Sequence, residues 1–148
     1  MLLRRDRTMI AILIMLDVAF HAGRNGTISA ADIAERAGLA RRGIEPLLQS
    51  LSRSGLLESV RGPRGGYRLG RPRRDILLAD ILAVITAEDN TDDGPIGGLF
   101  QKVVEPCWQE FDSMIDEKCR EISLDDLVRR AENAGMRRPQ PEPITFSI

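Results

Sequence analysis

Two short apolar patterns separated by one glycine constrain the fold of this chain more than any other feature. They lie in "ISAADIAERAGLARRGIEPLLQSLSRSGLL", residues 28–57. At helical spacing, the first face comprises Ala30, Ile33, Ala34 and Ala37, and the second comprises Ile44, Leu47, Leu48, Leu51 and Leu56. Ser29 is a candidate N-cap, with Asp32 at the capping-box position, and Gly38 separates the two faces. Two short helices joined by a tight glycine turn predict a helix-turn-helix.

A β-hairpin is predicted directly after this unit. "LLESV" at residues 56–60 and "YRL" at 67–69 have strand patterns, and "RGPRGG" between them has the proline and glycines of a turn. We expect Tyr67 to pack beneath the hairpin. Helical patterns flank the whole unit at residues 6–22 and 76–87. A helix-turn-helix followed by a hairpin is a winged helix.

A second helical region follows an acidic stretch that is rich in Gly and Pro. From Leu99 to Ile122 the apolar residues form one long stripe, which Pro106 should kink or divide. Ser123 is placed to cap a last short helix. We therefore predict a mainly α fold with a small β-hairpin. Its parts are a winged-helix domain at 1–88, an acidic linker at 89–98, a long helix and C-terminal helix at 99–135, and an extended tail at 136–148.

Charge is distributed very unevenly along the chain. Residues 1–74 contain 14 Arg or Lys and 6 Asp or Glu, a net charge of +8, whereas residues 75–148 contain 7 and 16, a net charge of −9. A basic front half is suited to a polyanion such as DNA. The chain has one histidine and two cysteines, so no Ser/His/Asp or Cys/His set can be argued, and we predict that it is not an enzyme.

Three phrases resemble the bacterial winged-helix repressors of the Rrf2 family, which includes IscR, NsrR and CymR. They are "IMLDVA" at 14–19, "DIAERAGL" at 32–39 and "LLESVRGPRGGYRLGRPRRDILLADI" at 56–81. The resemblance covers residues 1–135 in order and spacing. It implies a homodimeric repressor that binds an inverted DNA repeat. No membrane role is expected, because the apolar run at 9–16 is too short to span a membrane. In that family the second helix of the motif enters the major groove, the wing touches a neighbouring groove, and a long C-terminal helix forms the dimer.

Candidate DNA-binding residues follow from elementary recognition chemistry. Side chains near the start of a recognition helix read base edges, where Arg binds guanine and Glu accepts from cytosine. Proline at position 46 requires the helix to begin near Arg42 or to bend. In the wing, two arginines flank a proline turn that suits a narrow minor groove, while glycines admit phosphates and a further arginine can bind them. The predicted set is Arg41, Arg42, Glu45, Arg61, Arg64, Gly65 and Arg68.

The apolar stripe is too extensive for one exposed helix, so we expect it to pair with its copy in a homodimer. The predicted interface consists of Leu99, Val103, Trp108, Phe111, Met114, Ile115 and Ile122.

The family's cluster-sensing branch has three cysteines just before the long helix, but "AEDNTDDGPIGGLF" at 87–100 has none. We therefore predict no cofactor and no metal site. The chain has only two cysteines, which do not form a CxxC pair, and this predicts a reducing, cytoplasmic setting. Two alternatives stay open. One is a winged-helix module that binds only proteins, and the other is a thiol or cluster redox sensor that uses Cys107 and Cys119. The operator, the regulated genes and the effector cannot be deduced from the sequence.

Overall fold

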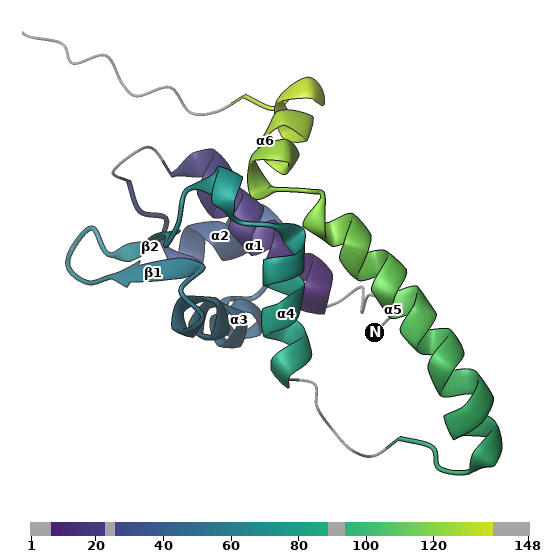
Figure 1. Cartoon of the computed structure of the whole chain (residues 1–148). Helices are drawn as coiled ribbons and strands as arrows, with labels where there is room; N and C mark the ends of the chain where they lie inside the picture. Colours follow the sequence, from purple (N-terminus) through teal and green to yellow (C-terminus); the bar gives the residue numbers. More distant parts are fainter. Residues whose placement is uncertain (1–6, 23–25, 89–93, 138–148) are drawn as a thin grey trace, which may run out of the picture.

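The computed structural model describes residues 7–22, 26–88 and 94–137 (Figure 1). The winged-helix part contains α1 (Arg7–His21), α2 (Ala30–Ala37), α3 (Arg41–Arg53), β1 (Leu57–Val60), β2 (Gly66–Leu69) and α4 (Leu78–Glu88), with a short 3₁₀ turn η1 (Arg73–Asp75) before α4. A π-helical turn η2 (Phe100–Val104) leads into α5 (Glu105–Arg120), and α6 (Leu124–Asn133) follows. None of the helices in the described ranges is long and apolar enough to cross a membrane.

Helix α1 lies at the centre of the molecule and contacts α2, α3, α4, α6 and β2. Its inner residues Ile14, Met15 and Val18 are fully buried, as the mostly apolar sequence predicts. The carboxylate of Asp17 joins α1 to α2, because Arg36 donates two hydrogen bonds of 2.8 Å to its oxygens. A buried carboxylate needs such a partner, and this bidentate pair fixes the first helix of the helix-turn-helix.

The turn between α2 and α3 forms as predicted. Ser29 caps α2, because its side-chain oxygen accepts a hydrogen bond of 3.1 Å from the backbone amide of Asp32. Gly38 ends the helix with φ of +68°, a left-handed conformation that glycine adopts without a Cβ clash. The apolar faces of both helices are buried through Ile33, Ala34, Ile44, Leu47, Leu48 and Leu51, whereas Ala37 is only half-buried.

The two strands pair antiparallel, with Leu57 opposite Leu69 and Val60 opposite Gly66. A third segment completes this small sheet, since Ile28 and Tyr67 exchange two backbone hydrogen bonds of 2.9 and 2.8 Å. The approach is so close that a Cβ on Gly66 would stand 2.5 Å from the carbonyl oxygen of Ile28. Tyr67 packs against the core beneath the wing, as expected.

The C-terminal helices share the core of the winged-helix part. Leu78 donates to the carbonyl of Ile122 at 2.9 Å, and Leu124 donates to the carbonyl of Ile76 at 2.8 Å. Ser123 caps α6 with a full capping box, as its position predicts, and Leu124 and Val128 are fully buried. Figure 1 shows α5 running alongside α4, on the side of the molecule away from the hairpin.

Pro106 does not break the long helix. It occupies the start of α5, and the turn before it widens so that the amide of Glu105 bonds to the carbonyl of Phe100, five residues earlier. A proline has no amide hydrogen for the usual bond, and a π turn is one way to continue past it. The fold class is confirmed as mainly α with a two-stranded hairpin. Part of the predicted acidic linker, 89–93, and most of the tail, 138–148, lie outside the described residues.

Candidate nucleic-acid interface

The first turn of α3 presents charged side chains to solvent. Arg41, Arg42 and Glu45 are all exposed, and Arg41 forms an ion pair of 3.0 Å with Glu45 one turn later. Within the described chain no carboxylate pairs with Arg42. The N-cap Ala40 makes no side-chain cap. The amide of Gly43 bonds to the carbonyl of Ala40 at 2.9 Å, and no side chain of the described residues bonds to the amides of Arg41 and Arg42, so the positive end of the helix is open to an anion.

Pro46 is accommodated without delaying the start of the helix. Helix α3 begins at Arg41 and continues through the exposed Pro46 to Arg53. All three candidate base-reading residues therefore lie in one continuous helix. The amide that Pro46 lacks would have bonded the carbonyl of Arg42, so the first turn is tied to the rest of α3 by fewer backbone hydrogen bonds.

The wing turn holds two exposed arginines away from the core. No acidic residue of the described ranges pairs with Arg61 or Arg64. The backbone of the turn is held, because Thr27 donates its hydroxyl to the carbonyl of Arg64 at 2.7 Å. Gly65 has a local reason to be glycine, since a Cβ there would stand 2.6 Å from the carbonyl oxygen of Val60. Close packing within the turn therefore explains the glycine at position 65, and no phosphate contact is needed to explain it.

Other arginines of the wing region are engaged within the molecule. Arg68 pairs across the hairpin with Glu58 at 3.0 Å, and this hydrogen bond lowers the pKa of the Glu58 carboxyl. Arg73 joins Asp125 of α6 at 2.6 Å. Arg71 lies 3.8 Å from Asp80, a longer and weaker contact. Among the described residues, the arginines at the wing tip thus lack acidic partners, whereas Arg68 within the hairpin and Arg71 and Arg73 after it have them.

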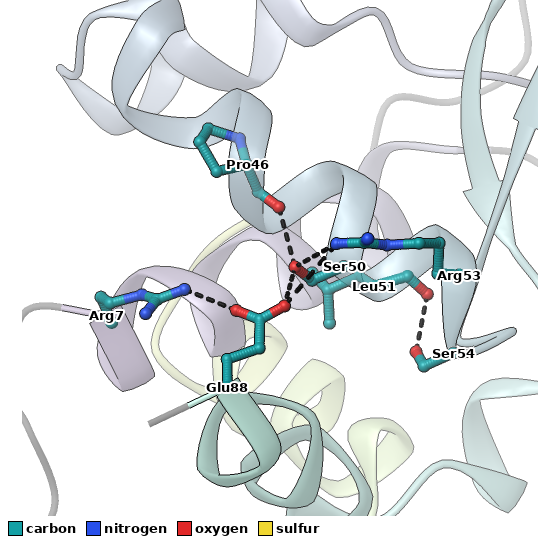
Figure 2. A network of polar contacts seen from close by, with 7 residues as sticks. All are labelled: Arg7, Pro46, Ser50, Leu51, Arg53, Ser54 and Glu88. Atoms are coloured by element: carbon teal, nitrogen blue, oxygen red, sulfur yellow. Dashed lines mark hydrogen bonds and ion pairs between the residues drawn. The ribbon is translucent and has the colours of Figure 1, made fainter. Parts of the chain in front are cut away.

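A polar cluster that sequence reasoning missed lies at the end of α4 (Figure 2). Glu88 accepts a hydrogen bond of 2.6 Å from Arg7 and a second one from the hydroxyl of Ser50. Arg53 lies 3.8 Å from the same carboxylate. These residues are 35 to 81 positions from Glu88 along the chain. No local pattern reveals such a contact.

An apolar stripe remains uncovered along η2 and α5. Its exposed members are Leu99, Val103, Val104, Trp108, Phe111 and Met114, with Leu99 82% and Met114 66% exposed. Trp108 and Phe111 meet edge to face, with ring centroids 6.0 Å apart. Ile115 and Ile122, which helical periodicity assigns to the same stripe, pack against the protein's own core. The outward-facing surface is therefore narrower than the sequence suggests.

The two cysteines do not fit an iron–sulfur cluster within one chain. Cys107 is exposed and Cys119 is buried on the same helix, and twelve residues at 1.5 Å each separate them by about 18 Å. Burial raises the pKa of the Cys119 thiol, with Asp116 adding to the shift, so the thiolate that a metal or oxidant needs is disfavoured. The described ranges contain no group of three His, Cys, Asp or Glu side chains able to hold a metal ion.

Comparison with known proteins decides the family. The model of the Rrf2 family, described as iron-dependent transcriptional regulators, matches residues 4–130. The chain belongs to the Rrf2 family. Among its relatives is the transcriptional regulator IscR of Xenorhabdus nematophila, 34% identical over 129 residues that cover 82% of this chain and 76% of the relative.

Solved Rrf2 structures resemble this one along nearly the whole chain. The IscR of T. potens superposes with a TM-score of 0.70 at 33% identity, covering 89% of this chain and 90% of the other. The CymR of B. subtilis, a global cysteine regulator, gives 0.69 at 25% identity, covering 88% and 98%. These relatives are named as transcriptional regulators and not as enzymes. The Rrf2 protein described here is accordingly a DNA-binding transcriptional regulator of winged-helix fold, which confirms the predicted family and the absence of an enzymatic role.

Proposed function

We propose that this Rrf2 protein is a homodimeric repressor that acts in the cytoplasm and binds an inverted-repeat operator without an iron–sulfur cluster. Residues 1–88 would read the DNA, and residues 99–135 would hold the two copies together. The proposal depends on one observation: exposed arginines occur both at the start of α3 and at the tip of the wing. Arg42 lies at the open start of α3, and Arg61 and Arg64 lie at the wing tip, all without acidic partners in the described chain.

Each group is suited to a different part of the duplex. The start of α3 brings Arg41, Arg42 and Glu45 to base edges in the major groove, and its open amides to a phosphate. The guanidinium groups of Arg61 and Arg64 suit the negative potential of a narrow minor groove. Gly65 keeps the wing turn tight, and Arg68 reaches a phosphate only if it shares or leaves Glu58. The wing would therefore act mainly through its tip.

A homodimer is supported by the apolar stripe. Six large apolar side chains exposed along one helix surface are unusual for a monomer. A second copy of α5 offers a matching stripe, and a twofold axis along it would place two recognition helices for two half-sites. An inverted-repeat operator has the same symmetry.

Selection of DNA from a randomised or genomic pool by the purified full-length protein tests the proposal. We expect enriched sequences with two inverted half-sites about one helical turn apart. Enrichment of single, unpaired half-sites would contradict the dimer. A failure to enrich any sequence would favour the alternative of a module that binds only proteins. Where the pool is genomic, footprinting on the enriched site should then place it beside a promoter, as repression requires.

The cluster-free state has its own test. Protein purified without oxygen and supplied with iron and sulfide should stay colourless, and replacement of Cys107 and Cys119 by Ser should leave operator affinity and its response to oxidant unchanged. A visible charge-transfer band that the double variant lacks, together with altered DNA affinity, would establish the redox-sensor alternative instead.

A further inference from the structure

The last residue of α4 connects three helices of the DNA-binding part. The Glu88 carboxylate accepts hydrogen bonds from Arg7 of α1 and from Ser50 of α3, and Arg53 of α3 approaches it (Figure 2). Ser50 is 5% exposed, so its hydroxyl meets the carboxylate at the edge of the core. We call Arg7, Ser50, Arg53 and Glu88 the Glu88 cluster.

The Glu88 carboxylate lies at the C-terminal end of α4, where the helix dipole disfavours a negative charge. An acidic side chain at the C-terminal end of a helix faces the negative end of the helix dipole. The hydrogen bond from Ser50, with Arg7 and Arg53 nearby, nevertheless lowers the pKa of Glu88. The carboxyl is therefore ionised at neutral pH, and its partners on α1 and α3 are what stabilise the charge.

The cluster meets α3 one turn after Pro46. The Ser50 hydroxyl also lies 3.0 Å from the carbonyl oxygen of Pro46. Pro46 interrupts the backbone hydrogen bonds that join the first turn of α3 to its remainder. Helix α3 nevertheless runs unbroken from Arg41 to Arg53, so the orientation of its first turn follows that of the part after Pro46, which Glu88 holds one turn further along.

We propose that Glu88 is a positioning residue for DNA recognition, which holds the recognition helix α3 in a fixed orientation on α1 and α4 through Ser50, Arg7 and Arg53. The inference rests on the proposed role of α3 in operator binding. In this role Glu88 acts through α3 and does not itself need to contact DNA. It is also the last residue of α4. The cluster therefore holds α3 next to the point where the chain leaves α4.

A positioning role and simple electrostatics predict opposite changes in operator affinity when Glu88 loses its charge. Glu88→Gln removes a negative charge from a DNA-binding protein, which by itself would strengthen binding to any DNA. If Glu88 positions α3, the variant instead binds its selected operator about tenfold more weakly, equivalent to about 1.4 kcal/mol. Its binding to unrelated DNA stays the same or strengthens. Glu121→Gln is the matched control. It removes the same charge from the C-cap of α5, where Glu121 forms an exposed ion pair with Lys118 away from α3.

Ser50→Ala removes the hydroxyl without changing charge, and provides a second route to the same contact. Each single variant should lower operator affinity, and the double variant should lose less than the two losses combined, because both remove one interaction. Equal operator affinities for Glu88→Gln and Glu121→Gln, or strictly additive losses in the double variant, would overturn the inference.

Hydrogen exchange of the unbound protein distinguishes this inference from the function on which it rests. Amides of α3 should exchange faster in Glu88→Gln and Ser50→Ala than in the parent and in Glu121→Gln. Circular dichroism should show that all the variants keep the overall fold. Unchanged exchange in α3 would refute the cluster's hold on the helix. Faster exchange in the two variants, together with a parent protein that binds no operator, would keep that hold and reject the DNA-binding proposal instead.

Discussion

Arg41 and Glu45 form an ion pair across the first turn of the recognition helix, with 3.0 Å between Arg41 Nε and Glu45 Oε1. Both side chains remain about half exposed or more, at 64% and 49%. The pair is therefore weak in water and can be exchanged for base contacts. Arg42 beside it has no such partner in the described chain.

Base reading by this turn can be tested at single operator positions. Arg42→Ala and Glu45→Ala should each change the preferred base at one position, at a cost of about 1–3 kcal/mol for the best site, because a side chain that no longer reaches a base cannot discriminate it. Binding to a randomised operator library measures this. Glu121→Ala removes an acidic residue elsewhere and should leave the preference intact. A uniform change across all sequences would assign Arg42 and Glu45 to phosphate contacts.

The wing tip should contribute strongly to affinity. Replacing Arg61 and Arg64 together by Ala should cost about 1–3 kcal/mol for each arginine that reads the groove. The slope of log affinity against log salt should also become shallower by about one for each phosphate that the variant no longer neutralises. Titrations at several salt concentrations give both quantities. Arg120→Ala removes an exposed arginine of α5 as a control. Parent-like affinity in the double variant would show that the wing does not touch DNA.

A charge in the apolar stripe should separate the dimer. Val103 is 60% exposed, and an Asp there would be buried without a partner if two α5 helices pack together. Val103→Asp should therefore be monomeric in analytical ultracentrifugation at concentrations where the parent is a dimer, and its operator affinity should fall by at least about tenfold. Gln101→Asp adds the same charge at an exposed polar position two residues away. A dimer that survives Val103→Asp would place the interface elsewhere.

Stability should fall in mildly acidic solution because of His21. Burial, with the nearby Arg36, lowers the pKa of His21 below its ordinary value of 6.5, although Asp17 opposes the shift. The unfolded chain then takes up a proton at higher pH than the native protein. The contribution of His21 to the free energy of unfolding is therefore fully present well above the ordinary pKa of His and is lost as the pH falls through that value. Denaturant unfolding from pH 7.5 to 5.5 should show a smaller decrease for His21→Gln. Identical profiles would assign the decrease to other groups.

Two glycines should respond in opposite directions to the same substitution. Gly66→Ala should destabilise the fold by about 1–3 kcal/mol, because the new methyl group would stand 2.5 Å from the carbonyl oxygen of Ile28. Gly43→Ala should stabilise it by about 0.5–1 kcal/mol, since Gly43 lies within α3 with nothing inside 4 Å of a Cβ. Thermal unfolding of the two variants measures the contrast. A neutral Gly66→Ala would mean that the β2 segment shifts away from Ile28 at little cost.

Local sequence determined the helices and strands of the winged-helix part and the caps of α2 and α6. The spacing of Ile33, Ala34, Ile44, Leu47 and Leu48 predicts two buried helix faces, and the caps at Ser29 and Ser123 form as their positions require. Helix periodicity, capping and turn chemistry act within a few residues of one another, so a single sequence is enough to show them. The candidate DNA-binding residues could be listed for the same reason, because they occupy defined positions in a helix start and a tight turn.

Tertiary structure alone decided which side chains are free. The sequence predicts that both Arg61 and Arg68 bind DNA, yet among the described residues Arg61 lacks an acidic partner whereas Glu58 approaches Arg68 from the neighbouring strand. Arg73 is likewise engaged, because Asp125 approaches it from a distant helix. Likewise, one helical stripe contains both Met114, which faces solvent, and Ile115, which is partly buried against the core. The contact between Glu88 and Ser50 joins residues 38 positions apart. Such pairings depend on how helices pack against one another, and periodicity along a chain carries no information about the partner that a side chain will meet.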